Sequence, residues 1–204
     1  MNTYDFETRR TLSALGIRQE YQEDFMDGLE LLYELESEER RSKVKFTKLD
    51  SLSNGFFDSL YEPLSKCYEI EFWNSYYEYG SETYDYDLLV CFNKKYGIQL
   101  RFEEDPEEII LELIYRYADK EIRPKVGFKD TMLTLEQCLR QTEVKSIKLS
   151  VMSISCHKRL PRRHYSERSK HTLTDSDLRC VYSELGYELN SGNTMIKYLT
   201  NQPS

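Results

Sequence analysis

Between residues 68 and 102, apolar side chains recur at every second position, which is the spacing of a β-strand with one buried face. The alternating positions are Tyr68, Ile70 and Phe72, then Tyr86, Leu88, Val90 and Phe92, then Ile98, Leu100 and Phe102. Turn-forming sequences, Gly80-Ser81 and residues 93–97, separate the three runs. The pattern predicts a three-stranded antiparallel meander with one apolar face and one polar face.

A helix is predicted directly after the meander, because helix-start signals precede an apolar stripe at helical spacing. Asp105 and Glu108 match a capping box, and Pro106 occupies the first helical position. The stripe consists of Ile110, Leu113, Ile114 and Tyr117, and Pro124 is expected to end the helix. Other helices are expected over 5–15, 18–41 and 132–141, and from Asp175 or Ser176 to Gly186.

The predicted fold class is α+β, with helices segregated around a small sheet. We expect a small antiparallel β-meander (about 66–104) and a further strand (144–155) with a bulge near 152, with helices packed on one face. Residues 44–49 are expected to form a short edge strand. The chain is predicted to be a single domain over 1–204. The sequence also allows an N-terminal helical subdomain (1–60) and a C-terminal basic loop plus helix (157–204).

Cysteine usage and hydropathy indicate the compartment. The five cysteines are odd in number and widely spaced, without a CxxC pair, which is typical of reduced thiols. No run of about 18 apolar residues occurs, and the N-terminal residues lack the apolar core of a signal peptide. We therefore expect a cytoplasmic protein without membrane contact.

Charge is divided sharply along the chain. Residues 68–87 contain eight aromatic and six acidic side chains, with no Lys or Arg. Residues 157–171 contain six cations, one Glu and all three histidines, so this loop carries +5 while the whole chain carries −8. Such a separation favours either contact with another charged surface or docking of the basic loop on the acidic sheet.

The acidic, Tyr-rich hairpin is the leading candidate for a binding site. Adjacent tyrosines on a strand point to opposite faces, so a core on one face cannot bury all of them. Exposed tyrosines and tryptophans act as anchors at interfaces, and carboxylates steer association. The expected partner-binding residues are Trp73, Tyr76, Tyr77, Glu78, Tyr79, Glu82, Tyr84, Asp85 and Asp87.

Our leading hypothesis is a non-enzymatic interaction or inhibitor protein that binds a basic, nucleic-acid-processing partner. In composition, the chain is similar to small acidic inhibitors encoded by phages and mobile elements, which suggests a role in host–virus interaction. A rigid acidic sheet can present charge much as a nucleic-acid backbone does. This hypothesis requires no cofactor.

The polar face of the meander also allows a metal site. If the second hairpin pairs residues whose numbers sum to about 190, Asp87 lies opposite Glu103 and diagonal to Arg101. Like charges placed directly across a strand pair are destabilising, so a cation is expected among them. Three further acidic residues are expected on this face, namely Glu69, Glu71 and Asp85.

The sequence GSETYDYDLLV resembles the Gly-Ser…Asp-x-Asp signature of nucleotidyltransferase-fold proteins. The resemblance implies that Asp85 and Asp87 hold Mg²⁺ or Mn²⁺, that Glu103 completes the site, and that Gly80 and Ser81 contact phosphate. In that family a helix begins at the Gly-Ser pair, whereas a hairpin turn is predicted here. The alternative function is therefore a metal-dependent nucleotidyltransferase-like or phosphodiester enzyme.

A second alternative is nucleic-acid binding through the basic loop. Cationic side chains contact phosphate, and the ring of Tyr165 can stack on a base. The residues expected to bind phosphate or an acidic surface are Arg159, Arg162, Arg163, Arg168 and Lys170. The sequence leaves open whether this loop binds nucleic acid or the protein's own acidic face.

Overall fold

An eight-stranded sheet forms the centre of the structure, a computed structural model that describes residues 3–19, 21–23, 25–26, 44–49, 55–79, 82–102, 105, 107–116, 124–151 and 173–199. The strand order is β1-β2-β3-β4-β5-β6-β8-β7. The strands are β1 (Val44–Lys48), β2 (Glu69–Tyr79), β3 (Glu82–Phe92), β4 (Tyr96–Phe102), β5 (Glu108–Arg116), β6 (Ser146–Ser150), β7 (Glu188–Ser191) and β8 (Thr194–Tyr198). Neighbouring strands are antiparallel except for the parallel pair β5–β6. The α+β class is as predicted, but the sheet is much larger than a small meander.

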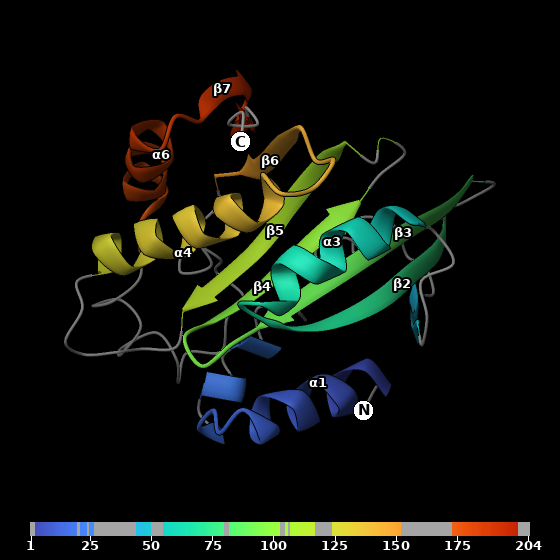
Figure 1. The fold of residues 1–204 in the computed structure, drawn as a ribbon. Helices are drawn as coiled ribbons and strands as arrows, with labels where there is room; N and C mark the ends of the chain where they lie inside the picture. Colours follow the sequence, from blue (N-terminus) through green and yellow to red (C-terminus); the bar gives the residue numbers. More distant parts are fainter. Residues whose placement is uncertain are drawn as a thin grey trace.

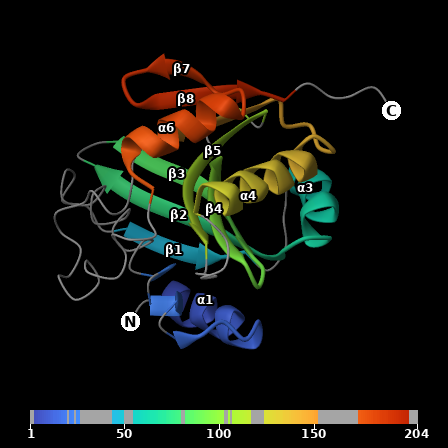
Figure 2. The same cartoon turned by 90° about the vertical axis from the view of Figure 1, so that its left-hand side faces the viewer.

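Helices cover both faces of this sheet (Figures 1 and 2). The face that carries α3, α4 and α6 is called the α3 side, and the face that carries α1 is called the α1 side. Each side has its own cluster of buried apolar residues, with Leu64, Leu89 and Leu135 on the α3 side and Leu12 and Trp73 on the α1 side. The prediction that helices pack on one face is therefore wrong. The helices whose bounds fall within the described residues are α1 (Thr3–Ala14), α3 (Gly55–Ser65), α4 (Pro124–Leu139) and α6 (Asp175–Glu184).

Strand β3 is buried on both faces, which explains why helices cover both faces of the sheet and not one. It pairs with β4 so that Asp87 lies opposite Phe102, one residue away from the predicted register. A shift of one residue exchanges the faces of a strand. As a result, Leu89 packs on the α3 side, whereas Leu88 and Val90 pack on the α1 side. The meander has two apolar faces along its central residues.

Residues 108–116 form β5 and not the predicted helix. The side chain of Asp105 accepts a hydrogen bond from the Glu107 backbone N–H at 2.9 Å, so the cap-like signal belongs to the turn between β4 and β5. The strand lies between β4 and β6, and Ile109, Leu111 and Leu113 are buried. An apolar strand covered on both faces imitates a helical stripe, because its apolar residues need not alternate.

Several other elements agree with the sequence expectations. α1 corresponds to the helix expected over 5–15, and β1 is the expected edge strand. α6 is present, although Thr174, rather than Asp175 or Ser176, is its N-cap and forms a capping box with Asp177. α4 begins at Pro124, which had been expected to end a helix, and so includes most of the helix predicted over 132–141.

Other expectations fall partly or wholly outside the described residues. Of the helix expected over 18–41, the structure describes helical residues only up to 26, and β6 is the described part of the strand expected over 144–155. The bulge near 152 and the basic loop 157–171 lie outside the described residues. α3, β7 and β8 were not predicted. The division into domains stays a prediction, and no described helix has the length and apolar character needed to cross a membrane.

Candidate functional site

The β2–β3 hairpin carries most of the predicted site residues, and its register decides which of them meet. Asn74 lies opposite Asp87, and Tyr76 lies opposite Asp85. Side chains alternate along a strand, and Phe72 in the same series packs on the α3 side. Asn74, Tyr76, Asp85 and Asp87 are therefore neighbours on the α3 side of the hairpin.

A hollow of about 360 Å³ opens at this position, and its lining residues are Asn74, Asp85, Asp87 and Phe102. We call these four residues the acidic hollow. The side-chain amide of Asn74 donates a hydrogen bond to Asp85 and another, at 3.3 Å, to Asp87. Asp85 is exposed and Asp87 is half-buried. The amide thus holds two carboxylates side by side at an open surface.

The two carboxylates of the acidic hollow have no cationic partner within the described part of the chain, where every ion pair joins other residues. Arg101 does not neutralise them, as had been considered from the sequence. It lies opposite Leu88 on the α1 side, and its Nε is 2.9 Å from Glu112 Oε1. Its guanidinium group also lies over the ring of Tyr86, 4.6 Å from the centroid.

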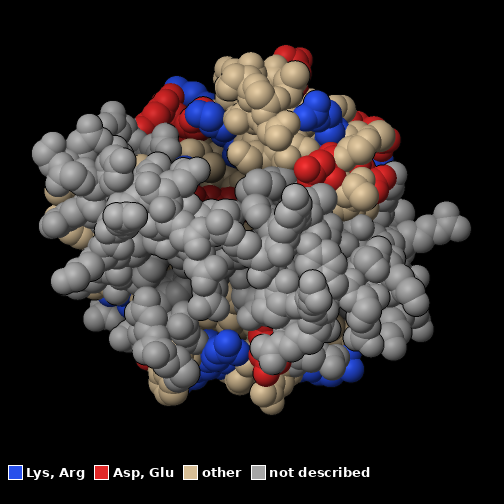
Figure 3. All heavy atoms as spheres, turned by 180° about the vertical axis from the view of Figure 1, so that it is seen from behind, with Lys and Arg blue, Asp and Glu red and all other residues tan. Residues whose placement is uncertain are grey.

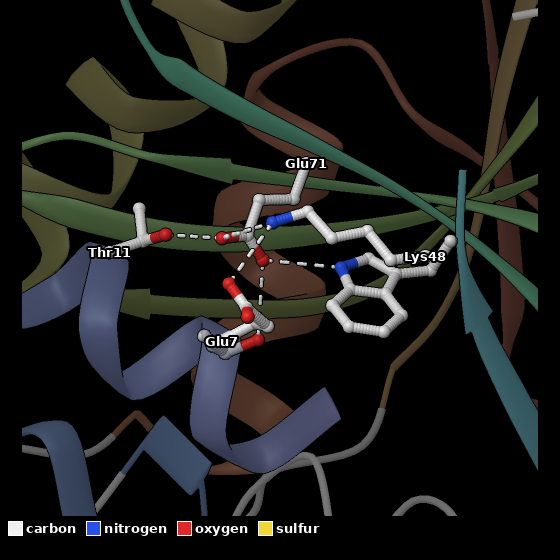
Figure 4. A network of polar contacts seen from close by, with 6 residues as sticks. Glu7, Thr11, Lys48 and Glu71 are labelled. Atoms are coloured by element: carbon white, nitrogen blue, oxygen red, sulfur yellow. Dashed lines mark hydrogen bonds and ion pairs between the residues drawn. The ribbon is translucent and has the colours of Figure 1, made fainter. Parts of the chain in front are cut away.

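On the α1 side of the same hairpin, Glu71 occupies a very different environment (Figure 4). Its side chain is 5% exposed. The carboxylate accepts hydrogen bonds from the hydroxyls of Thr11 and Thr8 and, at 3.1 Å, from Nε1 of Trp73. A buried carboxylate without such donors would destabilise the folded state strongly. Glu71 therefore has a structural role in this network.

Lys48 completes this network. Its ammonium group is 3.7 Å from Glu71 and 3.6 Å from Glu7, and it lies 5.7 Å from the ring centroid of Trp73. Glu7 comes from α1, Lys48 from β1 and Glu71 from β2, so the network joins three elements that are distant in sequence. The charge of Glu71 is balanced inside the protein.

These positions correct two expectations. Trp73 is fully buried at 0% exposure, so it is not an exposed anchor for a partner. Glu71 lies on the opposite face from Asp85, so the acidic residues do not share one polar face. The physical reason is the same for both residues: α1, together with Tyr21, Phe25 and Met26, covers a face that was expected to be solvent-exposed.

The remaining predicted residues are only partly placed. Tyr76 is half-buried. Five residues lie on β2 or β3, but their side chains are outside the described part of the structure: Tyr77, Glu78, Tyr79, Glu82 and Tyr84. Glu103 and the basic residues Arg159, Arg162, Arg163, Arg168 and Lys170 lie outside the described residues. Among the described residues, no group of three or more His, Cys, Asp or Glu side chains is arranged to hold a metal ion.

Asn74 and Phe102 belong to the site but were not identified from the sequence. The signal for Asn74 was present, because the two-residue turn predicted at Gly80-Ser81 would fix the register of β2 against β3. That register places Asn74 opposite Asp87. Phe102 could not be found in the same way, since its position depends on the register of the next hairpin.

On the face opposite that of Figure 1, the charged side chains of the described residues in view are of both signs. Figure 3 shows acidic and basic side chains of described residues next to one another around the margin of this face. No protein-family model matches the chain, and no curated protein matches its sequence. Function must therefore be inferred from the side chains and their geometry.

Proposed function

We propose that this chain is a non-enzymatic binding or inhibitor protein whose acidic hollow receives a cationic group of a basic partner protein. The observation that supports the proposal is the paired arrangement of Asp85 and Asp87, which the Asn74 amide holds together at an open surface without a described cationic partner. A nucleic-acid-processing protein is a suitable partner, because its own basic surface is complementary to such a site.

The energetics favour a cation from outside. Two carboxylates held close together repel each other, so an entering cation gains favourable interactions with both. An arginine guanidinium fits this site best, because its planar group carries several N–H donors and can donate hydrogen bonds to both carboxylates at once. Phe102, which also lines the hollow, is only 5% exposed and belongs to the apolar cluster on the α3 side, so it gives the hollow an apolar wall beside the two carboxylates.

The rest of the hairpin extends this proposed surface. Tyr76 lies directly opposite Asp85 on the same face. Further along the hairpin, Tyr77 pairs with Tyr84 and Tyr79 pairs with Glu82, so these four positions alternate with Tyr76 and Asp85, whereas Glu78 continues their series. We propose that a partner contacts both faces of the hairpin beyond the hollow, with the tyrosines as anchors and the glutamates as steering charges. They are Tyr77, Glu78, Tyr79, Glu82 and Tyr84.

A comparative capture experiment tests the proposal. The wild type, the double variant Asp85→Asn/Asp87→Asn and a control, Glu143→Gln/Glu188→Gln, would be immobilised and exposed to the same basic proteins. The control changes the net charge equally at two exposed glutamates far from the hollow in sequence. The wild type and the control should retain a common partner that the Asp variant loses. Equal retention by all three chains would contradict the proposal.

Metal binding is the principal alternative use of the same carboxylates. The Asn74 amide presents hydrogen-bond donors, and not oxygen lone pairs, to both Asp85 and Asp87, so it supplies no ligand to a metal ion and competes with one for the carboxylate oxygens. Calorimetric titration with Mg²⁺ and Mn²⁺ should therefore show no saturable micromolar binding. Saturable binding that Asp87→Ala abolishes would favour the metal-dependent enzyme instead.

Two further expectations remain proposals. A cytoplasmic location is consistent with the four described cysteines, all of which are free thiols. Nucleic-acid binding through residues 157–171 would show a steep salt dependence that Arg162→Ala and Arg163→Ala reduce.

A further inference from the structure

The β2–β3 hairpin continues past the end of the next strand. β3 begins at Glu82, but β4 ends at Phe102, which lies opposite Asp87. Within the described part of the chain, no strand pairs with Thr83 or Asp85 on the side where β4 lies. Figure 1 shows the hairpin extending beyond the end of β4. The first residues of β3 therefore have an open edge, although β3 is an inner strand of the sheet.

The direction of the backbone groups along this edge follows from the β3–β4 turn. The Asn93 backbone N–H donates to the Tyr96 carbonyl at 3.0 Å. In an antiparallel ladder, every second residue directs its N–H and C=O groups to the same neighbouring strand. The series that faces β4 therefore runs back from Asn93 to Asp87, and the regular register of β3 continues it to Asp85 and Thr83. The backbone groups of Asp85 and Thr83 point to a side where no described strand lies.

The open edge lies next to the acidic hollow. Thr83 and Asp85 are exposed, and they share the α3 side with Asp87 because side chains alternate along a strand. Phe102 lies opposite Asp87 and lines the hollow. A strand added antiparallel to β3, in line with β4, would have its next residue on this face directly opposite Asp85. A long cationic side chain at that position would reach both carboxylates of the hollow.

We propose that the open edge of β3 binds an extended, basic segment of the partner protein by β-strand addition, with one arginine of that segment in the acidic hollow. The inference rests on the proposed function and specifies how the partner is bound. Backbone hydrogen bonds with Thr83 and Asp85 would give affinity for an extended segment, and the hollow would select a cationic side chain.

Charge decides between a basic segment and a second copy of this chain. Two copies paired through this edge would each bring Asp85 and Asp87 to the same short interface. Like charges near each other across a strand pair are destabilising. A basic segment has the complementary charge and is therefore the better occupant.

Amide hydrogen exchange of the full wild-type chain, measured by NMR, tests the inference. The probe is an eight-residue peptide of alternating Arg and Val, whose arginines lie on one face when it is extended. At saturating peptide, exchange of the Thr83 and Asp85 backbone N–H groups should slow by roughly tenfold or more, because each gains a ladder hydrogen bond. Tyr84 alternates with them and directs its N–H toward β2, so its exchange should not change.

Removal of single backbone donors separates strand addition from charge attraction. Thr83→Pro removes one N–H of the open edge and keeps both carboxylates, and Thr83→Ala is the matched control that keeps the N–H. Calorimetry should show roughly tenfold weaker peptide binding for Thr83→Pro than for Thr83→Ala. N-methylation of the peptide arginines should weaken binding similarly, whereas N-methylation of the valines should not, because their N–H groups would point away from β3. Circular dichroism verifies the folding of Thr83→Pro, and the exchange measurement does not depend on this variant.

Two results would overturn the inference, and they differ in what they mean for the proposed function. In the first, the peptide binds the wild type and not Asp85→Asn/Asp87→Asn, but exchange at Thr83 and Asp85 is unchanged and the two methylated peptides bind equally. A cation then enters the hollow without strand addition, and the proposed function stands. In the second, the peptide does not bind the wild type, and the proposed function fails together with this inference.

Discussion

The two faces of the β2–β3 hairpin carry carboxylates in opposite conditions. On the α1 side, Glu71 is buried and is balanced by Lys48, two hydroxyl groups and the Trp73 indole. On the α3 side, Asp85 and Asp87 share a single amide donor and face an open hollow. The same acidic stretch therefore contains one residue with a full set of partners inside the fold and two that have no cationic partner among the described residues. What distinguishes Glu71 from Asp85 and Asp87 is the burial of each side chain and the donors around it, because all three are acidic residues of the same segment.

The largest expected effect is at Trp73. Trp73→Ala removes the largest fully buried side chain and the Nε1 donor to Glu71. We expect it to lower the free energy of unfolding by about 4 kcal/mol, measured by urea denaturation. Partner binding by the fraction that still folds should be unchanged. A stable variant that loses only partner binding would show that Trp73 acts as an anchor after all.

Removal of the buried carboxylate should have the next largest effect. Glu71→Ala leaves the donors of Thr8, Thr11 and Trp73 without an acceptor and Lys48 without this ion pair. We expect the free energy of unfolding to fall by about 3 kcal/mol in the same assay. A loss of less than about 1 kcal/mol would mean that water readily replaces the network.

At the hairpin, the expected effect is on binding, with Tyr76 in the series of Asp85 on the α3 side and the adjacent Tyr77 in the alternate series. Tyr76→Ala combined with Tyr77→Ala should weaken affinity for a basic partner by well over tenfold, because aromatic anchors dominate interface energetics. Isothermal titration calorimetry with a captured partner measures this change. Tyr198→Ala, at an exposed position on β8, is the matched control and should bind normally. Undiminished affinity in the double variant would exclude the hairpin as the binding surface.

The smallest effect on stability is expected in the acidic hollow itself. Asp85→Asn/Asp87→Asn should change the free energy of unfolding by less than about 0.5 kcal/mol, because Asp85 is exposed, Asp87 is only half-buried and their mutual repulsion is removed. The association rate with a basic partner should nevertheless fall and lose most of its salt dependence, as stopped-flow mixing would show. A destabilisation comparable to that of Glu71→Ala would show that Asp85 and Asp87 have a structural role instead.

The sequence predicted elements well where local signals and burial agree. β2, β3 and β4 alternate around clear turns, and α6 has the polar N-terminus and glycine stop of an ordinary helix. Prediction failed at β5, where a register shift against β4 between Gln99 and Leu100 interrupts the alternation. Residues 108–116 are apolar at helical spacing, and β5 is covered on both sides. Its pairing with β6, which begins thirty residues later, is a long-range contact that no local pattern encodes.

The candidate site could likewise be predicted only as far as local sequence patterns determine it. The acidic residues were visible in the sequence, but their assignment to two faces depended on the register and on the cover that α1 provides. Asp85 and Asp87 were correctly placed together, and the turn at Gly80-Ser81 contained the information for Asn74. Nothing local marked Glu71 as buried, because its donors Thr8 and Thr11 lie about sixty residues earlier.

The most direct test of the acidic hollow is an NMR titration of the ¹⁵N-labelled chain with an octa-arginine peptide. The account predicts that the largest shift changes occur at the Asn74 side-chain amide and at the backbone amides of Asp85 and Asp87, while the buried Trp73 indole N–H stays constant. The Asp85→Asn/Asp87→Asn variant should lose these changes, and Glu143→Gln/Glu188→Gln should retain them. Changes that are no larger at Asn74 than around Glu143 and Glu188 would contradict the account.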